Sequence, residues 1–208
     1  MRHTKTEQTL KLAAQIGILR PRDLDTYGIP RHYLHRLYQR GLLEQVDRGL
    51  YRAKETALSE HHSLLEASKR VPQGVICLLS ALRFHGLTTQ EPFEVWLAIP
   101  EKARRPQPGI LSIRLVHFSG QALTEGIEEH EIEGVKIKIY NAAKTVADCF
   151  KYRHKIGLDV ALEALRDALQ LQNEQGQRIC TIDELWHYAT ICRVTNVMKP
   201  YLEAMVEG

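Results

Sequence analysis

The sequence predicts an α+β protein, in which an N-terminal winged helix-turn-helix precedes a mixed α/β domain with strands first and a helical C-terminal half. Three patterns predict it: three short helical segments followed by a hairpin, alternating apolar and polar runs in the middle of the chain, and a helical period from Asn141 onward. The chain has 208 residues, of which 44% are hydrophobic and 25% are charged, enough for two small domains. We expect a winged helix-turn-helix domain over residues 1–56 and an α+β domain over 57–208, with 57–73 as a connecting helix.

The first three helices are marked by their ends. Residues 5–18 have apolar side chains at helical spacing, with Thr4 or Thr6 as the candidate N-cap. Residues 21–27 begin with a proline, which is tolerated in the first turn of a helix, and end before a glycine. A second proline opens the helix predicted over residues 30–41, which ends at another glycine.

A hairpin and a connecting helix follow. Residues 42–46 and 50–53 are short β-prone runs on either side of the turn-forming triplet Asp47-Arg48-Gly49. Three helices followed by a hairpin is the order of elements in a winged helix-turn-helix. Residues 54–73 then predict a helix that Ser59 can cap.

The middle of the chain alternates between strands and loops. Residues 74–87 are an apolar segment that we expect to end in a helix begun at Ser80. Residues 93–100 and 111–118 predict strands, and the segment between them, rich in proline and charge, predicts an exposed loop. Residues 130–140 alternate again, but Gly134 interrupts them, so they predict either two strands or one strand with a bulge.

The C-terminal half predicts helices. Asn141 is a suitable N-cap for a helix over residues 142–155, and Gly157 separates that helix from the next, over 158–172. Residues 173–177 predict a turn. Two further helices are expected at the end of the chain, one capped by Thr181 and a last one over about 195–206.

The charge of the chain is unevenly distributed. Residues 1–53 contain ten Lys or Arg against five Asp or Glu, a net charge of +5, whereas the remaining residues carry a net charge of −2. A local basic excess of this kind favours a polyanionic partner.

The third helix has the composition of a DNA recognition helix. At about 100° per residue, Ile29, Leu34, Leu37 and Leu42 can face inward, while the opposite side carries cations and amides. Arginine and glutamine can each present two hydrogen-bonding atoms to one base, and arginines on a wing reach phosphates or the minor groove. Tyr33 is expected in the core or at its rim, as is Tyr38. The predicted DNA-facing residues are Arg31, His32, His35, Arg36, Gln39 and Arg40 on the helix, Arg48 at the hairpin tip, and Arg52 just past it.

The run GIPRHYLHRLYQRGLLEQVDRGLYRA (residues 28–53) resembles the N-terminal winged-helix domain of AbiEi-type antitoxins. The shared features are a Gly-Ile before the helix, the L-x-R-L core, the Gly-Leu-Leu exit and the Arg-Gly-Leu-Tyr wing. The resemblance continues in LLSALRFHGLTTQEPFEVWLAIP, in EGVKIKIYNAAKTVADCFKYRHKIGLDVALEALRDA and in VMKPYLEAM, so it extends over most of the chain.

The resemblance implies the antitoxin of a type IV toxin–antitoxin pair, associated with abortive phage infection. In that family the N-terminal domain binds inverted repeats of double-stranded DNA in its own promoter and represses the operon. The C-terminal domain counters a nucleotidyltransferase-like toxin without forming a stable complex. Carried onto this chain, the resemblance assigns DNA contact to Arg31, His32, His35, Arg36 and Arg48. It assigns no residue to the antitoxin surface.

Two other functions stay open. Winged-helix units also serve as protein-interaction modules that bind no DNA. A DNA-binding module can also be fused to a metal-dependent, restriction-like nuclease, which needs acidic residues on adjacent strands and a nearby lysine. Such residues exist at Glu94, Glu131, Glu133 and Lys136, but no D/E-x-K triplet lies on a predicted strand.

The sequence gives little support for an enzyme. The histidines lack the spacing that places two metal ligands on one helical face, and no nucleophile-elbow or phosphate-loop motif occurs. We therefore expect no catalytic site, no metal and no cofactor. No apolar run is long enough to span a membrane, the N-terminus lacks a secretory signal, and the four cysteines form no C-x-x-C pair. These features indicate a cytoplasmic protein with buried or free thiols at Cys77, Cys149, Cys180 and Cys192.

Overall fold

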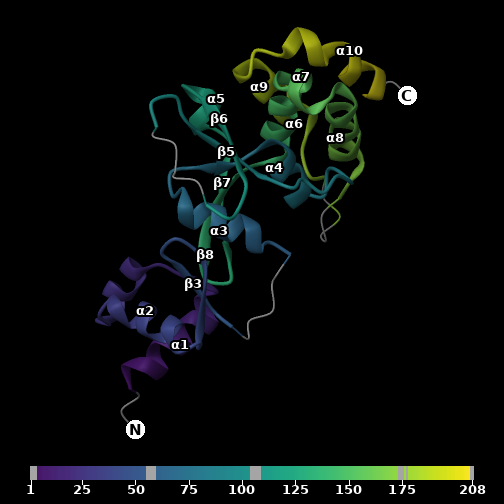
Figure 1. Ribbon diagram of the computed structural model, residues 1–208. Helices are drawn as coiled ribbons and strands as arrows, with labels where there is room; N and C mark the ends of the chain where they lie inside the picture. The colour runs from purple at the N-terminus through teal and green to yellow at the C-terminus, as the bar shows by residue number, and fades with distance from the viewer. Residues whose placement is uncertain (1–3, 55–59, 104–108, 173–175, 177, 207–208) are drawn as a thin grey trace. The chain divides into compact units, whose positions relative to one another are not determined.

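The computed structural model describes residues 4–54, 60–103, 109–172, 176 and 178–206 (Figure 1). The contacts of the chain divide it into two compact units. The first contains residues 1–73 together with 105–112 and 129–137, and the second contains residues 74–104, 113–128 and 138–208. The domain boundary expected after residue 56 stays a prediction.

The first unit has the element order of a winged helix. Its three strands form an antiparallel sheet in the order β1-β3-β2. Together with the helical C-terminal half described below, it confirms the predicted α+β class. The elements are α1 (Lys5–Ile16), β1 (Ile18–Leu19), the 3₁₀ helix η1 (Pro21–Tyr27), α2 (His32–Gln39), β2 (Leu43–Asp47), β3 (Leu50–Ala53) and α3 (His62–Arg70).

Local signals set the ends of these helices. Thr4 caps α1 in a capping box, since its hydroxyl accepts from Glu7 N and the Glu7 carboxylate accepts from Thr4 N. The connecting helix α3 begins at His62 and ends one residue before Val71-Pro72, where the missing proline N–H prevents its continuation. The cap expected at Ser59 lies outside the described residues.

The core of the first unit is built from the inward side of its helices. Leu24, Leu34 and Leu37 are fully buried, and Leu12, Ala13, Leu19, Ile29, Leu43 and Tyr51 complete the cluster. The inward position expected for Leu42 is wrong, because its side chain is 43% exposed. Since α2 ends at Gln39, Leu42 no longer follows the helical period that would turn it inward.

A five-stranded sheet has the strand order β6-β5-β4-β8-β7. Strand β4 pairs antiparallel with β5 and parallel with β8, and β5 pairs parallel with β6. Two helices lie among these strands, of which α4 was expected from the sequence and α5 was not. The elements are β4 (Val75–Ile76), α4 (Leu78–Phe84), β5 (Val95–Pro100), β6 (Ile113–Phe118), α5 (Gln121–Thr124), β7 (Ile127–Ile132) and β8 (Val135–Tyr140).

The segment around Gly134 forms two strands. Glu133 and Gly134 make the two-residue turn between β7 and β8, with φ angles of 51° and 70°. Positive φ at both central positions is what a type I′ hairpin requires, and glycine adopts it without steric cost. The alternative of one bulged strand is therefore wrong.

Helix α4 begins at Leu78 and not at Ser80 as expected. The Ser80 side chain has another role, because its hydroxyl accepts a hydrogen bond of 2.9 Å from Trp96 N and so joins α4 to β5. A serine that satisfies a buried strand N–H cannot be distinguished from an N-cap by its place in the sequence.

The C-terminal helices are α6 (Ala142–Lys151), α7 (Arg153–Ile156), α8 (Leu158–Gln170), α9 (Ile182–Ile191) and α10 (Thr195–Val206). Helix α6 is the centre of this group, since every residue from Ala142 to Phe150 is buried and α4, α8 and α9 all pack on it (Figure 1). Both predicted caps are present: Asn141 Oδ1 accepts from Lys144 N at 2.8 Å, and Thr181 forms a capping box with Glu184.

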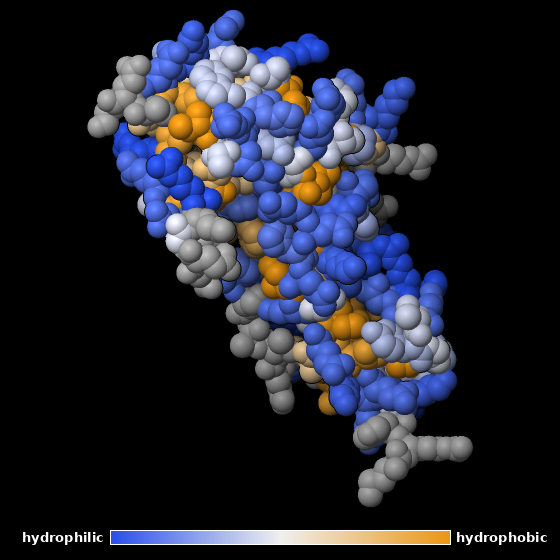
Figure 2. Space-filling model, turned by 180° about the vertical axis from the view of Figure 1, so that it is seen from behind, coloured by the Kyte–Doolittle hydropathy of each residue, from blue (hydrophilic) through white to orange (hydrophobic). Residues whose placement is uncertain are grey.

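All four cysteines lie in the second unit as free, buried thiols. On the face drawn in Figure 2, hydrophilic side chains predominate, and the hydrophobic ones form small separate groups. Among the described residues, no helix has the length and apolar character needed to cross a membrane.

Candidate nucleic-acid interface

Helix α2 separates its apolar and polar side chains onto opposite faces. Leu34 and Leu37 are fully buried in the core. The six polar residues predicted to face DNA are all exposed: Arg31, His32, His35, Arg36, Gln39 and Arg40. The helix therefore presents a row of hydrogen-bond donors and acceptors wide enough to lie along base edges.

Aromatic rings lie on either side of this row. The Arg36 guanidinium carbon is 5.9 Å from the centroid of the Tyr33 ring, which packs against the core. The Tyr38 ring lies 6.1 Å from the rings of both His35 and Tyr51. These contacts limit the rotamers of Arg36 and His35, so less side-chain entropy is lost when either residue binds.

Arg31 begins the row in an ion pair with Asp25. Its Nε donates to Asp25 Oδ1 at 2.9 Å, and both side chains are exposed. The hydrogen bond from Arg31 lowers the pKa of Asp25, and the same contact raises the pKa of Arg31, so both groups stay charged. A phosphate that binds Arg31 must therefore compete with a carboxylate.

The two wing arginines lie in different surroundings. Arg48 is exposed at the tip of the β2–β3 hairpin, where its backbone N–H donates to Asp47 Oδ1 at 2.6 Å. Arg52 lies within β3, opposite Glu44 on β2, and its half-buried guanidinium pairs with the Glu44 carboxylate. Of the two, Arg48 is the one placed to reach an external phosphate.

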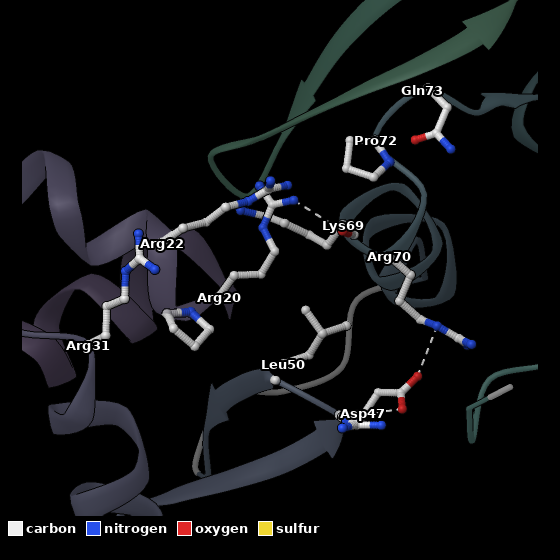
Figure 3. Close-up of a pocket in the computed structure, with 12 residues that line it drawn as sticks. Arg20, Arg22, Arg31, Asp47, Leu50, Lys69, Arg70, Pro72 and Gln73 are labelled. Atoms are coloured by element: carbon white, nitrogen blue, oxygen red, sulfur yellow. Dashed lines mark hydrogen bonds and ion pairs between the residues drawn. The ribbon is translucent and has the colours of Figure 1, made fainter. Parts of the chain in front are cut away.

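A cavity of about 720 Å³ adjoins the start of α2 (Figure 3). The cavity lies between η1, the hairpin tip and the end of α3. Among the described residues that line it, Asp47 is the one with a carboxylate. Six cationic residues surround it: Arg20, Arg22, Arg31, Arg48, Lys69 and Arg70. Arg31 belongs both to this cavity and to the exposed row on α2.

Ion pairs hold part of this cationic lining in place. The Asp23 carboxylate lies between Arg20 and Lys69, at 3.1 and 2.9 Å, and Asp47 Oδ2 is 3.0 Å from Arg70 Nε. Burial raises the pKa of Asp23, but hydrogen bonds from Lys69 and Arg20 outweigh that effect and leave it lowered. Asp23 therefore remains ionised at neutral pH and positions two cations at the cavity wall.

Four of these cations were not among the residues predicted to face DNA. Arg20 and Arg22 flank the proline that begins η1, and Lys69-Arg70 ends α3. The basic excess of residues 1–53 includes Arg20 and Arg22 but does not show where they lie, and no sequence signal pointed to Lys69 and Arg70. The pairing of β1 with β3 and the return of the chain through α3 bring them together.

The comparisons bear on the region that contains this interface. Residues 7–54 match the model of the family described as "Transcriptional regulator, AbiEi antitoxin". The N-terminal region is similar to that of AbiEi-type antitoxins. The resemblance read from residues 28–53 is thereby confirmed, whereas the one read from the downstream blocks stays a prediction.

The fold of the whole chain is similar to that of a solved structure. The crystal structure of the RV2827C protein from Mycobacterium tuberculosis superposes with a TM-score of 0.56, at 14% sequence identity, over 99% of this chain and 82% of that one. At this identity the likeness shows the fold alone. No curated protein matches the sequence.

The residues weighed for a nuclease have other partners or positions. Glu94 pairs with Arg114 at 2.6 Å, while Glu131 lies on β7 and Glu133 in the turn that follows it. Lys136 is exposed on β8. Within the described part of the chain, no group of three or more His, Cys, Asp or Glu is placed to hold a metal ion.

Proposed function

We propose that this protein is a DNA-binding antitoxin that represses transcription of its own operon, a type IV toxin–antitoxin operon of phage defence. The observation that carries the proposal is the exposed polar row of α2 next to the cationic cavity, in a region that matches the AbiEi antitoxin family. A DNA-binding site needs a helix that can contact bases and a surface beside it that can bind phosphates, and the described residues of this region support both roles.

The two parts of the interface have different roles in this mechanism. Arg36 and Gln39 contact base edges in the major groove, with His32 and His35 beside them. Arg48 and the cavity cations Arg22 and Arg31 bind phosphates, which fixes the register of α2 in the groove. Because phosphate contacts release counterions, this part of the affinity falls steeply with salt.

The operator is proposed to contain inverted repeats, so that two copies of the chain bind related half-sites. The second unit is proposed to oppose a nucleotidyltransferase-like toxin without a stable complex. This part of the proposal depends on the family resemblance, and no residue is assigned to it. We expect the protein to act in the cytoplasm, without a catalytic site or a cofactor.

Arg36→Ala tests the base-reading role. We expect it to weaken binding to the chain's own upstream DNA by about 1–3 kcal/mol and to weaken binding to scrambled DNA much less. Fluorescence anisotropy with labelled duplexes of both kinds, over a range of salt concentrations, measures the two affinities.

Lys11→Ala is the matched control, because Lys11 is an exposed cation of α1 outside both the α2 row and the cavity. It should change neither affinity by more than a small factor. If the unsubstituted protein shows no preference for its upstream DNA over scrambled DNA, the operator proposal fails. A protein-interaction role for the winged helix would then be favoured.

A further inference from the structure

The second unit contains a cavity of about 650 Å³ that the proposed function does not use. It is lined by residues 117–122 at the end of β6 and the start of α5, by the end of α6 from Asp148 to Tyr152, and by residues 190–193 between α9 and α10. Its volume falls within the range of about 300–1,000 Å³ that is usual for small-molecule sites.

The floor of this cavity is a buried ion pair. Asp148, 3% exposed, lines the cavity, and its Oδ2 lies 2.6 Å from the Nζ of the fully buried Lys144. Cys192 Sγ donates to Asp148 Oδ1 at 3.1 Å, and Lys144 Nζ lies 4.1 Å from the centroid of the Tyr140 ring. Because the Lys144 cation offsets the carboxylate, the floor offers fixed acceptor oxygens with little net charge.

The wall of the cavity carries two cations. Lys151 and Arg193 are both exposed, and no carboxylate among the described residues forms an ion pair with either. Since the charge of Asp148 is already offset, the cavity as a whole is electropositive. A lysine and an arginine on the wall above a neutral polar floor suit an anion, and arginine can bind two oxygens of one phosphate at once.

The backbone at Arg193 is a second, independent sign of a functional position. Its φ is 57°, in the left-handed region, where α9 ends and Val194 N donates to Ala189 O at 2.8 Å. Helices that end in this way usually have glycine at this position, because other residues are strained there. The chain has an arginine instead, and its side chain lines the cavity.

We propose that this cavity binds an organic phosphate of about nucleotide size. Lys151 and Arg193 hold the phosphate group, and Asp148 accepts a hydrogen bond from an N–H or O–H group elsewhere on the ligand. The strain at Arg193 persists because the guanidinium is required at this place. The site lies in the second unit and does not depend on DNA binding by the first.

The test uses the full chain and four probes in low-salt buffer: AMP, ribose 5-phosphate, inorganic phosphate and adenosine. Isothermal titration calorimetry should show saturable binding of at least one of the two organic phosphates, weaker binding of inorganic phosphate, and none of adenosine. Comparison of AMP with ribose 5-phosphate tells a nucleotide from a sugar phosphate. If neither organic phosphate binds, or if adenosine binds as well as AMP, the proposal is overturned.

Arg193→Gly and Lys151→Gln locate the site. Each substitution should weaken binding of the organic phosphate by about tenfold or more, because each removes one charge-assisted hydrogen bond to the phosphate group. Arg193→Gly should not lower the melting temperature, because glycine relieves the left-handed strain, and this separates a binding role from a structural one.

Two controls complete the test. Lys199→Gln removes an exposed cation of α10 that does not line the cavity, and Arg22→Ala removes one from the cavity of the first unit. Both should bind the organic phosphate as the unsubstituted chain does. Unchanged affinity in both Arg193→Gly and Lys151→Gln would show that the ligand binds elsewhere, and the proposal would fail.

Discussion

At the scale of single residues, Glu66 is a buried carboxyl group whose ionised form is disfavoured by its surroundings. Its side chain on α3 is 6% exposed, and its Oε1 has no hydrogen-bond partner among the described residues. Burial raises its pKa, and the nearby Asp47 carboxylate raises it further, against the opposing effect of Arg70 and Arg52. The surroundings of Glu66 therefore favour its neutral form over its ionised form.

Glu66→Gln tests this interpretation. Because the pKa of Glu66 is higher in the folded chain than in the unfolded chain, protonation of Glu66 stabilises the folded state. This contribution to stability is fully present below the unfolded pKa, near 4.5, and is lost as the pH rises through the folded pKa. At pH 7 the substitution should therefore increase the free energy of unfolding, by about 1 kcal/mol. Urea denaturation at pH 7 and at pH 4.5 should show the difference at neutral pH and its decrease in acid.

The control for Glu66→Gln is the exposed Glu203 of α10, where Glu203→Gln should change stability by less than about 0.5 kcal/mol at either pH. Should Glu66→Gln destabilise the chain at pH 7, the carboxylate would be a stabilising partner of Arg70 or Arg52, contrary to our interpretation.

Arg22 should contribute to the affinity for DNA in a way that depends on salt concentration but not on the DNA sequence. It is exposed at the start of η1 and lines the cationic cavity. Arg22→Ala should lower the slope of log affinity against log salt concentration by about 1, equally for operator and scrambled DNA. The anisotropy titrations used for Arg36 measure this slope. A loss of preference for the operator would instead mean that Arg22 contacts bases.

At the scale of elements, the N-cap of α6 joins two helices. Asn141 Oδ1 accepts from Lys144 N, and Asn141 Nδ2 donates to the Tyr188 hydroxyl on α9 at 2.9 Å. Asn141→Ala removes both bonds and should lower the free energy of unfolding by about 1–2 kcal/mol. Asn141→Asp keeps the cap acceptor and should cost less, as measured by urea denaturation.

Tyr188→Phe removes the Asn141–Tyr188 bond from the other side. Combined with Asn141→Ala, it should cost little more than Asn141→Ala alone, because that substitution already removes this hydrogen bond. Fully additive costs would show that this bond does not contribute to the packing of α9 on α6.

Elements with local signals were predictable from the sequence, and those without were not. Caps at Thr4, Asn141 and Thr181 were correct, because a capping side chain bonds to its own helix. Strand β1 and helix α5, of two and four residues, were missed, since neither is long enough to show a period. The prediction that Leu42 faces inward was wrong, because α2 ends at Gln39 and the helical spacing of apolar residues no longer applies to Leu42.

At the scale of the whole molecule, the first unit is assembled from three separate stretches of chain. Residues 105–112 and 129–137 belong to it. Arg70 Nη1 donates to Leu111 O at 2.9 Å, and Gly134 lies so close to α1 that an added Cβ would be 3.4 Å from Gln15 O. A sequence pattern could not predict these contacts, because they join residues far apart in the chain.

A fragment of residues 1–73 should therefore be less stable than the same residues in the full chain. Without residues 105–112 and 129–137, the end of α3 and the exposed side of α1 lose contacts that order them. Hydrogen exchange by mass spectrometry should show faster exchange in α1 and α3 of the fragment. Equal protection in both proteins would show that the first unit folds without the two inserted stretches.

The candidate interface was predictable only in part. The α2 row follows from helical periodicity, since its six polar side chains are exposed while Leu34 and Leu37 are buried. The cavity beside it does not, because Asp23 joins the neighbouring Arg20 to Lys69, which lies 46 positions away from Asp23 in the sequence. The DNA contacts themselves stay predictions until binding is measured.

The buried cysteines give the protein a practical use in labelling experiments. Burial raises the pKa of all four thiols, that of Cys180 to about 12, so few thiolates exist at pH 7 to react with a maleimide. A cysteine placed at the hairpin tip, as in Arg48→Cys, would then be the fast-reacting thiol. A fluorophore attached there would report how the wing approaches DNA, without prior removal of any native cysteine.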